Sequence, residues 1–542
     1  MKKNILITNC VLAVLFLVIA QSCSKKLDLT PTNDVTSEIV YSTPAGYKQV
    51  LGKVYGSFAL TGNQGPAGNG DVQGIDEGFS DFYRLFWKAQ ELSTDEAVIS
   101  WGDVGIQDFH NMNWTSNNSF LTGLYYRSLY QITLCNDFIR ESADDKLAAR
   151  GISGADADNI RQYAREARFL RAFQYWVLMD LYGNPPFATE ATIIGGAPPP
   201  RATRIEIFNY IETELKDIEA NMPAARSNEY GRADKGAVWA LLARLYLNAQ
   251  VYTQDPVTHV LGAPRFTDAI TYSKKVIDAG YTLVNNYTWL MRADNHLNTS
   301  EFIFTINYDG LHTQGYGGTT FLTHACVGGS MPASAFGVGG GWSGTRTTKN
   351  LPLLFPDLTG TADKRSQFYT SGQNIEIANV TSFVDGLAVT KFNNVKRDGS
   401  NGQSQDFSDV DMPLFRLAEM YLIYAEAVLR GGTGGDATTA LGYINKLRGR
   451  AYANDPNSTT GNINSGTLTL DFILEERARE LYWEGFRRTD LVRYNKFTEG
   501  TYLWPWKGGV SSGTGVSAFR KIFPIPSRDI NSNLNLIQNP GY

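Results

Sequence analysis

Three aromatic residues occur in loops and are flanked by flexible, polar sequence. Trp101 follows "DEAVIS", Tyr316 lies in "GYGGTTF", and Trp342 stands in the glycine run "GGGWSG". A sugar ring has an apolar C–H face that an indole or phenol can cover, and a hydroxyl rim that polar side chains can satisfy. The three residues therefore indicate a carbohydrate site. Taken singly, each is better explained as an anchor that pins its loop to the core.

Two short motifs have the spacing of known chemical sites. Gly509 to Gly513 spells G-x-S-x-G, which requires a strand-to-helix turn that exposes the serine, but the surrounding sequence is a Gly/Ser loop. Gly339, Gly341 and Gly344 spell G-x-G-x-x-G, with no strand before them, no helix after them and a bulky tryptophan inside. We interpret both as coincidences of glycine-rich sequence.

Metal and acid–base chemistry find little support in the chain. The five histidines lack metal-ligand spacing and are interpreted as packed or surface residues: His110, His259, His296, His312 and His324. With 54 acidic residues some carboxylate pair is inevitable, and adjacent pairs such as Asp95–Glu96 are more simply helix caps or surface charges. We expect no catalytic residue and no cofactor. An irregular calcium site built from loop oxygens is left open.

The N-terminus has the form of a targeting segment. Lys2 and Lys3 precede an apolar stretch, Ile5–Ala20, that is short for a membrane-spanning helix. It ends in "IAQSC", which predicts a lipoprotein signal over residues 1–22 and lipid attachment at Cys23. Acyl chains would then tie the mature protein to a membrane without crossing it. An ordinary secretory signal is the alternative, because Ala20 stands where such signals usually carry leucine.

Composition and charge bound the remaining classes of protein. The 542 residues are 43% hydrophobic and 19% charged with a net charge of -5, which is ordinary globular composition. This acidic balance argues against nucleic-acid binding, which needs a basic footprint. Beyond the signal and Cys23, only Cys135 and Cys326 remain, so no disulfide framework can be read, and their pairing is left open.

The elements that must position the loop aromatics are helices. Helical periodicity with few breakers covers the following segments: Asn159–Tyr182, Arg204–Asn221, Asp234–Tyr252, Thr267–Ala279, Leu414–Arg430, Thr438–Arg450 and Leu470–Phe497. The starts at Arg204, Asp234 and Thr267 are spaced by roughly thirty residues, close to a helix-pair repeat of tetratricopeptide type. The sequence predicts a mainly α fold with such a scaffold. An irregular helical domain is the alternative.

Glycine-rich, poorly periodic segments interrupt these helices. They include residues 59–80, 309–350 and the polar stretch 398–411. Because long loops inside a compact domain are uncommon and often functional, we expect the site there. Residues 23–542 are therefore expected to form one domain, whose loop-rich insertions cover about 59–120 and 300–412.

Several longer segments resemble one known family. They include "DEGFSDFYRLFWKAQELSTDEAV", "REARFLRAFQYWVLMDLYGNPPF", "PLFRLAEMYLIYAEAVLRGG", "ILEERARELYWEGFRRTDLVRYNKF" and the terminal "FPIPSRDINSNLNLIQNPGY". On these segments the mature chain resembles the RagB/SusD family of outer-membrane glycan-binding lipoproteins, and "YLWPWKGG" and "YGGTTFL" resemble its starch-binding members. The resemblance implies a surface-facing, lipid-anchored protein that captures starch or maltooligosaccharides. It also implies a TonB-dependent transporter of the SusC type as partner.

The resemblance also assigns binding residues. It places an aromatic arc on Trp101, Tyr316 and Trp342, with Asp76 and Arg84 as polar partners. Arg84 would donate to sugar hydroxyls, although an ion pair with a nearby acid is its alternative role.

Two positions depart from the starch-binding pattern. Ile99 replaces a second tryptophan, and a sugar-contacting asparagine is missing, with Asp103 the nearest polar residue. These departures weaken the prediction of starch more than that of glycan binding. Another α-glucan or a host oligosaccharide is the alternative ligand, and a glycoside hydrolase or a protein-binding repeat scaffold would be a different class of protein.

Overall fold

The computed structural model describes residues 37–66, 68–255 and 260–542. The predicted signal over residues 1–22, Cys23 and His259 lie outside the described residues. The described α-helices are α2 (Ser37–Val40), α3 (Pro44–Gly56), α4 (Phe82–Glu91), α5 (Asp108–Asn111), α6 (Ser119–Glu141), α7 (Asp144–Ala149), α8 (Gly154–Tyr182), α9 (Arg204–Glu219), α10 (Lys235–Leu247), α11 (Ala249–Tyr252), α12 (Phe266–Asp278), α13 (Gly318–Ala325), α14 (Leu417–Leu429), α15 (Ala437–Ala453), α16 (Leu470–Leu481), α17 (Arg487–Arg493) and α18 (Ser527–Ser532).

Short strands pair in the same described ranges. They are β1 (Val98–Ile99), β2 (Phe302–Ile306), β3 (Thr345–Arg346), β4 (Phe368–Tyr369), β5 (Ala388–Val389) and β6 (Met412–Arg416). The antiparallel pairs are β1 with β3, β2 with β6 and β4 with β5. Helices therefore dominate the fold, and the prediction of a mainly α protein is confirmed.

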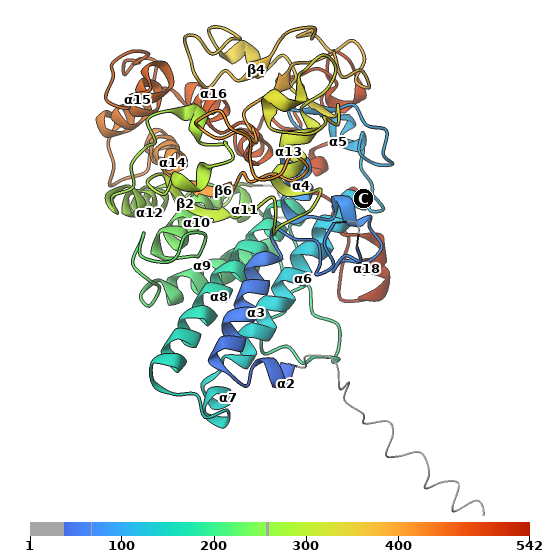
Figure 1. Cartoon of the computed structure of the whole chain (residues 1–542), viewed down its shortest axis with the longest axis vertical. Coiled ribbons are helices and arrows are strands. Elements are labelled where there is room, and N and C mark those ends of the chain that lie inside the picture. The colour runs from blue at the N-terminus through green and yellow to red at the C-terminus, as the bar shows by residue number, and fades with distance from the viewer. Residues whose placement is uncertain (1–36, 67, 256–259) are drawn as a thin grey trace, which may run out of the picture.

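The helices form a continuous array in which neighbours pack face to face. Helix α6 packs on α8, α8 on α9, α10 on α12, α12 on α14, and α14 on α15 and α16. Figure 1 shows this series running from α3, α6 and α8 through α10 and α12 to α14 and α15. One hydrophobic cluster runs from Tyr41 to Leu536 and includes residues of these helices and of the loop-rich segment.

Local sequence signals explain where individual helices begin and end. Helix α9 starts with a capping box, in which the Thr203 hydroxyl accepts from the Glu206 N–H and the Glu206 carboxylate accepts from the Thr203 N–H. The Asp234 carboxylate caps α10, as the predicted start at this residue requires. Helix α8 ends at Gly183, whose φ of 74° is tolerated because glycine has no side chain.

The prediction of one helix over Leu470–Phe497 is wrong. Helix α16 ends at Leu481 and α17 begins at Arg487, with positive φ at Trp483 (64°) and Gly485 (83°) between them. The break positions Glu484 so that its carboxylate accepts two hydrogen bonds from Arg416, at 2.7 and 2.8 Å. Tertiary ion pairing thus overrides a strong local helical pattern.

Two further elements differ from the sequence prediction. The predicted start of a helix at Leu414 lies in strand β6, which pairs with β2, and the helix begins at Leu417. Helix α6, with 23 residues, was not predicted. Its long run of aromatic and polar residues hides the apolar stripe that packs on α8.

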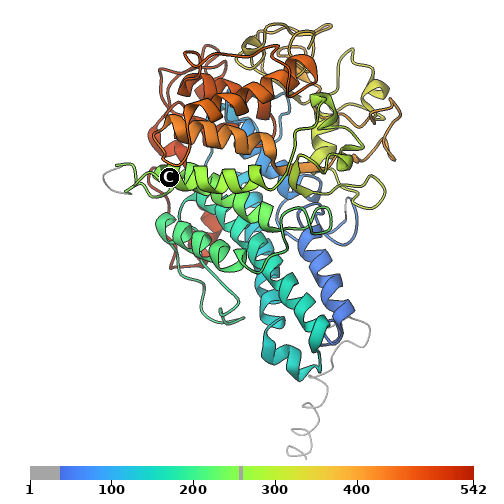
Figure 2. The same ribbon diagram turned by 90° about the vertical axis from the view of Figure 1, so that its left-hand side faces the viewer.

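The loop-rich segments gather at one corner of the molecule, as the yellow trace in Figure 2 shows. They are joined by the two-residue sheet of β1 and β3, which pairs Ile99 with Thr345 across some 246 positions of sequence. The Ser100 N–H extends this ladder by donating to the Gly344 carbonyl at 2.9 Å. The residues next to this sheet, Trp101 and Trp342, are thereby brought side by side.

Candidate functional site

The structure brings the three predicted aromatics together. The Trp101 indole N–H donates to the Trp342 carbonyl at 3.0 Å, and the two ring centroids lie 6.4 Å apart. The Tyr316 ring lies 6.3 Å from that of Trp342 and is 38% exposed. We call these three residues the aromatic arc. Trp101 and Trp342 are half-buried against the core, so the arc offers rings that are both held in place and partly open.

The glycine loop is fixed by backbone hydrogen bonds to the end of α13. The Trp342 N–H donates to the His324 carbonyl at 2.9 Å, and the Gly344 N–H donates to the Ala325 carbonyl at 2.7 Å. The His324 ring stacks on the Trp342 indole at 4.8 Å, and burial lowers the pKa of His324. Trp342 is therefore packed on one side by a residue that the sequence could only identify as a packed histidine.

Two glycines in this loop are required by close contacts. A Cβ at Gly344 would meet the Trp101 indole at 2.7 Å, and a Cβ at Gly341 would meet the Val327 carbonyl oxygen at 2.2 Å. Gly340, by contrast, has open space at its Cβ position. The glycines thus allow the loop to lie directly under the Trp101 ring.

Arg84 lies under the arc and joins its loops. Its Nη1 donates to the carbonyls of Gly78 and Tyr316, both at 2.7 Å. The guanidinium lies 5.6 Å from the Trp101 ring and 5.9 Å from the Trp342 ring. Arg84 is only 8% exposed, and burial lowers its pKa to about 10. The structure therefore gives Arg84 a positioning role. The sequence predicted instead a hydrogen-bond donor to sugar or a partner in an ion pair.

The two predicted acids stand at the edge of the arc. Asp76 is exposed and caps a short 3-10 helix by accepting the Gly78 N–H at 2.9 Å, and Gly78 separates it from the Tyr316 ring. Asp103 is exposed in the loop after Trp101. The negative charges of both acids partly offset the effect of burial on Arg84. Both are open to a ligand lying on the arc.

Three supporting residues were missed by the sequence reasoning. The Asp81 carboxylate accepts the N–H groups of Arg84 and Gly318, at 2.9 and 2.8 Å, and so joins α4 to α13. Burial raises its pKa to about 6. Phe407, in the polar stretch 398–411, packs 5.7 Å from Tyr316, and Phe321 lies 4.8 Å from the Arg84 guanidinium. Of these three residues, only Asp81 could have been recognised from the sequence, because an aspartate directly before a helical pattern is typical of a helix cap.

Ile99, the predicted departure from a fourth aromatic, is fully buried in β1. Its side chain belongs to the core and adds nothing to the surface of the arc. The arc of this chain therefore consists of three aromatic rings.

The other possible chemistry among the described residues would come from metal-binding, thiol or serine groups. Across the described residues, no group of three or more His, Cys, Asp or Glu is arranged to hold a metal ion. Cys135 and Cys326 are free thiols, and burial raises the pKa of each to about 12. Ser511, in the G-x-S-x-G motif, is exposed in a turn rather than at a strand-to-helix junction.

Comparison with known proteins places this arrangement in a family. A model of the SusD family matches residues 363–542, and a model described as starch-binding associating with outer membrane matches residues 81–247. The starch-binding protein SusD of Bacteroides thetaiotaomicron is 35% identical, with 96% of each chain covered. The chain belongs to the SusD family.

Other relatives agree with this assignment. The SusD-like protein P38 of Formosa agariphila is 24% identical over 100% of this chain and 99% of its own. A surface glycan-binding protein A from Bacteroides thetaiotaomicron, solved with laminarihexaose, is 20% identical with a TM-score of 0.68 and covers 91% of this chain and 99% of its own. That likeness establishes the fold, and the tetratricopeptide-like helical scaffold predicted from the repeat spacing is confirmed.

Membership of the SusD family makes this chain a surface glycan-binding protein that is associated with the outer membrane. It is a binding protein rather than a hydrolase. Over the ranges that the structure describes, no helix is long and apolar enough to cross a membrane.

Proposed function

We propose that this protein captures starch and maltooligosaccharides on the aromatic arc and delivers them to a TonB-dependent transporter of the SusC type. The observation that carries the proposal is the sheet of β1 and β3, which holds Trp101 and Trp342 in one hydrogen-bonded unit beside Tyr316. Their rings cover apolar sugar faces. Asp76 and Asp103 accept hydrogen bonds from the hydroxyl rim.

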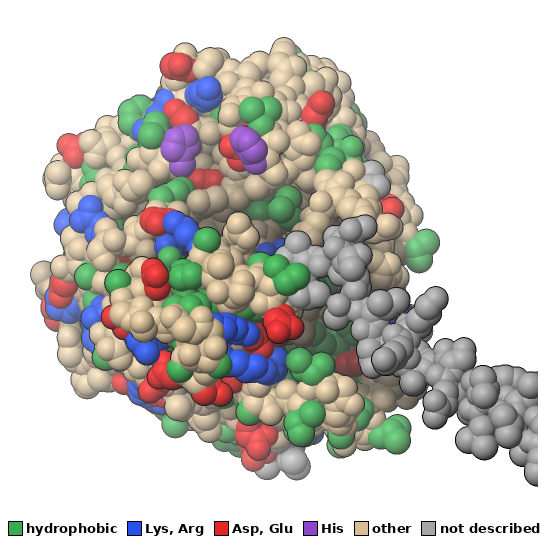
Figure 3. Space-filling view, turned by 60° about the horizontal axis from the view of Figure 1, so that its bottom comes forward, with side chains coloured by type: hydrophobic (Ala, Val, Ile, Leu, Met, Phe, Trp, Pro, Cys, Tyr) green, Lys and Arg blue, Asp and Glu red, His purple; other side chains and the backbone are tan. Residues whose placement is uncertain are grey.

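The lipid anchor at Cys23 and exposure on the cell surface belong to the same proposal. Anchoring would hold many copies at one membrane, and many weak contacts with one long polymer give a high avidity. On the face shown in Figure 3, basic and acidic side chains are interspersed rather than gathered into a single-sign stripe. Such a surface suits a neutral glycan better than a nucleic acid.

A different glycan is the second candidate. It is supported by Ile99, whose burial leaves three arc rings, and by Asp103 in place of a sugar-contacting asparagine. A structural relative that was solved with laminarihexaose supports it as well. This alternative keeps the arc and changes only the linkage that fits it.

Native gel electrophoresis through amylopectin and through laminarin tests the proposal. We expect amylopectin to retard the native protein, and Trp342→Ala to lose most of that retardation. Trp239→Ala is the matched control, because Trp239 is a half-buried tryptophan on α10 whose indole N–H donates to Glu219 at 2.7 Å. If only laminarin retards the protein, the ligand is a β-glucan and not starch. Equal retardation of native protein and Trp342→Ala would contradict the proposed site.

A further inference from the structure

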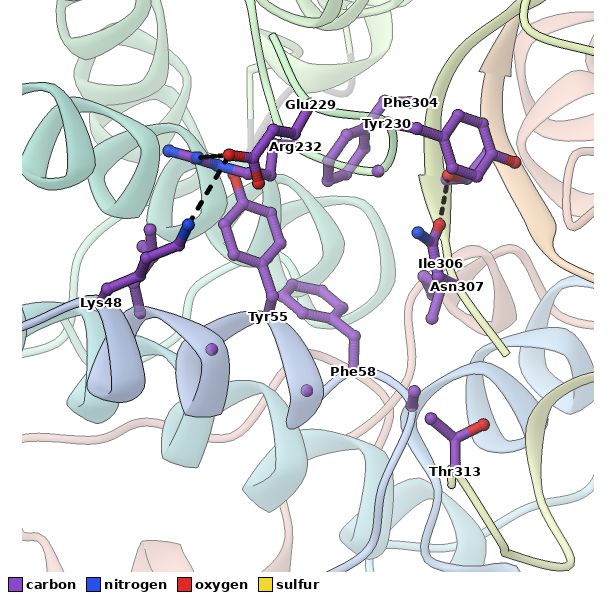
Figure 4. A pocket seen from close by; sticks show the side chains of 16 residues that line it. Lys48, Tyr55, Phe58, Glu229, Tyr230, Arg232, Phe304, Ile306, Asn307 and Thr313 are labelled. Carbon is purple, nitrogen blue, oxygen red and sulfur yellow. Dashed lines mark hydrogen bonds and ion pairs between the residues drawn. The ribbon is translucent and has the colours of Figure 1, made fainter. Parts of the chain in front are cut away.

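A cavity of about 280 Å³ lies away from the aromatic arc, between α3, β2 and the loop that precedes α10. Figure 4 shows side chains from these three parts of the chain pointing toward one space. None of the six predicted binding residues lines it. Its size is close to the lower end of the range for small-molecule sites.

One face of α3 leaves this space open. Lys48, Gly52 and Gly56 follow one another at four-residue spacing and all line the cavity. A Cβ at Gly52 or at Gly56 would meet nothing within 4 Å. Glycine inside a helix is destabilising, because its backbone loses more freedom on folding than that of other residues. Two such positions on one face therefore keep a volume free that larger side chains would fill.

The walls of the cavity are aromatic. Tyr55 and Tyr230 line it with partly exposed rings, whereas Phe58 and Phe304 also line it but are only 3% and 4% exposed. The Tyr55 hydroxyl donates to Glu166 at 2.7 Å and the Tyr230 hydroxyl donates to Asp411 at 2.8 Å. Both hydroxyls are thus used outside the cavity, as Figure 4 shows for Tyr230, whose oxygen points away from it. The rings are left to present apolar surface.

Polar groups stand at the edge of the same space. The Asn307 side-chain oxygen accepts from the Thr305 hydroxyl at 2.6 Å, and its nitrogen points toward the cavity in Figure 4. Lys48 and Glu229 are paired at 3.7 Å, with side chains 61% and 64% exposed. An exposed pair at this distance is weak and exchanges readily for other partners. Glu229 is also paired with Arg232, which lines the cavity, at 3.4 Å, so the edge carries amide, ammonium, guanidinium and carboxylate groups.

We propose that this cavity is a second carbohydrate subsite, which takes one or two pyranose units. Aromatic walls cover the C–H faces of a sugar ring, and the polar edge satisfies its hydroxyls. Thr313 lines the cavity and precedes Tyr316 of the arc by three residues, so the same loop borders both places. A subsite here lets one copy of the protein hold two stretches of glycan. The inference rests on the proposed function for the class of ligand.

Titration calorimetry with maltotriose, on purified full-length protein, tests the subsite. Trp342→Ala removes the ring that lies beside both Trp101 and Tyr316 and so disrupts the arc, and its residual binding reports on the cavity. We expect residual 1:1 binding in Trp342→Ala that weakens at least tenfold when Gly52→Leu is added. Gly52→Leu places a large side chain in the cavity and also replaces a glycine inside a helix. A melting temperature equal to or above that of the native protein shows that the variant keeps its fold. Gly442→Leu, at an exposed α15 glycine that also has open space, is the matched control.

The outcomes separate the subsite from the proposed function. If Trp342→Ala binds no maltotriose while the native protein does, the subsite is wrong and the arc stands. The subsite is equally wrong if Gly52→Leu leaves the residual binding unchanged. If the native protein binds neither maltotriose nor laminaritriose, the proposed function fails together with the subsite.

Discussion

The candidate site contains residues that offer rings and a residue that positions them. Trp101, Trp342 and Tyr316 offer rings, whereas Arg84 holds the loops that carry them through two carbonyl contacts. The types and loop positions of the aromatics could be predicted from the sequence, because bulky rings among glycines lack local packing partners. The role of Arg84 could not, since the carbonyls of Gly78 and Tyr316 belong to segments more than 200 residues apart.

Gly344→Ala tests whether the Trp101 ring must lie against the glycine loop. The added Cβ would meet the indole at 2.7 Å, so the ring must shift away from the loop. We predict that glycan affinity falls more than tenfold, because the displaced ring no longer lies in the arc. Gly340→Ala, in the same loop with open space at its Cβ, should bind as the native protein does. Equal affinity in the two variants would contradict the contact.

Trp101→Phe tests the hydrogen bond inside the arc. The variant keeps an aromatic ring and loses the indole N–H that donates to the Trp342 carbonyl. A single net hydrogen bond of this kind contributes about 1 kcal/mol. We predict a loss of affinity of roughly tenfold or less by calorimetry, smaller than for Trp101→Ala. The role assigned to the bond is wrong if Trp101→Phe binds as tightly as the native protein.

At the scale of elements, buried carboxylates hold the break between α16 and α17. The Glu91 carboxyl accepts the N–H of Gly485 at 2.7 Å, and the Glu96 carboxyl accepts the N–H of Trp483 at 3.2 Å. Burial raises the pKa of both carboxyl groups, and that of Glu96 to about 7. Repulsion from the Glu96 carboxylate raises the pKa of Glu91 further. One proton is therefore kept between them at neutral pH.

This shared proton makes stability depend on pH. From the ordinary glutamate pKa near 4.5 upward through neutral pH, the unfolded chain has released a proton that the folded protein retains, so stability falls as pH rises. Each retained proton contributes a slope of about 1.4 kcal/mol per pH unit. Glu91→Gln supplies a permanent N–H donor to Glu96.

We predict that Glu91→Gln loses less stability than the native protein between pH 5 and pH 7. Thermal melts at both values measure it. Glu475→Gln, an exposed position on α16, should follow the native slope. Parallel slopes in native protein and Glu91→Gln would show that no proton is shared.

The elements themselves were predictable to different degrees. Helices with clear caps, such as α9 and α10, begin within one residue of their predicted starts. The two-residue strands β1 and β3 were not predictable, because their pairing depends on contacts between distant segments and on no local pattern. That sheet sets the geometry of the candidate site, which is why the sequence could suggest candidate binding residues but not their arrangement.

At the scale of the whole molecule, the helical array supports loops that face one corner. The arc is open rather than enclosed, so little of a long glycan is buried by one copy. We predict weak binding of maltotriose in solution, and retention of amylopectin that rises steeply with the density of protein coupled to beads, because avidity grows with the number of contacts. Retention proportional to density at all loadings would indicate independent, tight sites instead.

The most direct test of the central claim is a crystal structure of the full chain soaked with maltoheptaose. Our account predicts sugar rings lying on Trp101, Trp342 and Tyr316, with hydroxyls within hydrogen-bond distance of Asp76 or Asp103. Bound maltoheptaose that leaves all three arc rings uncovered would contradict it.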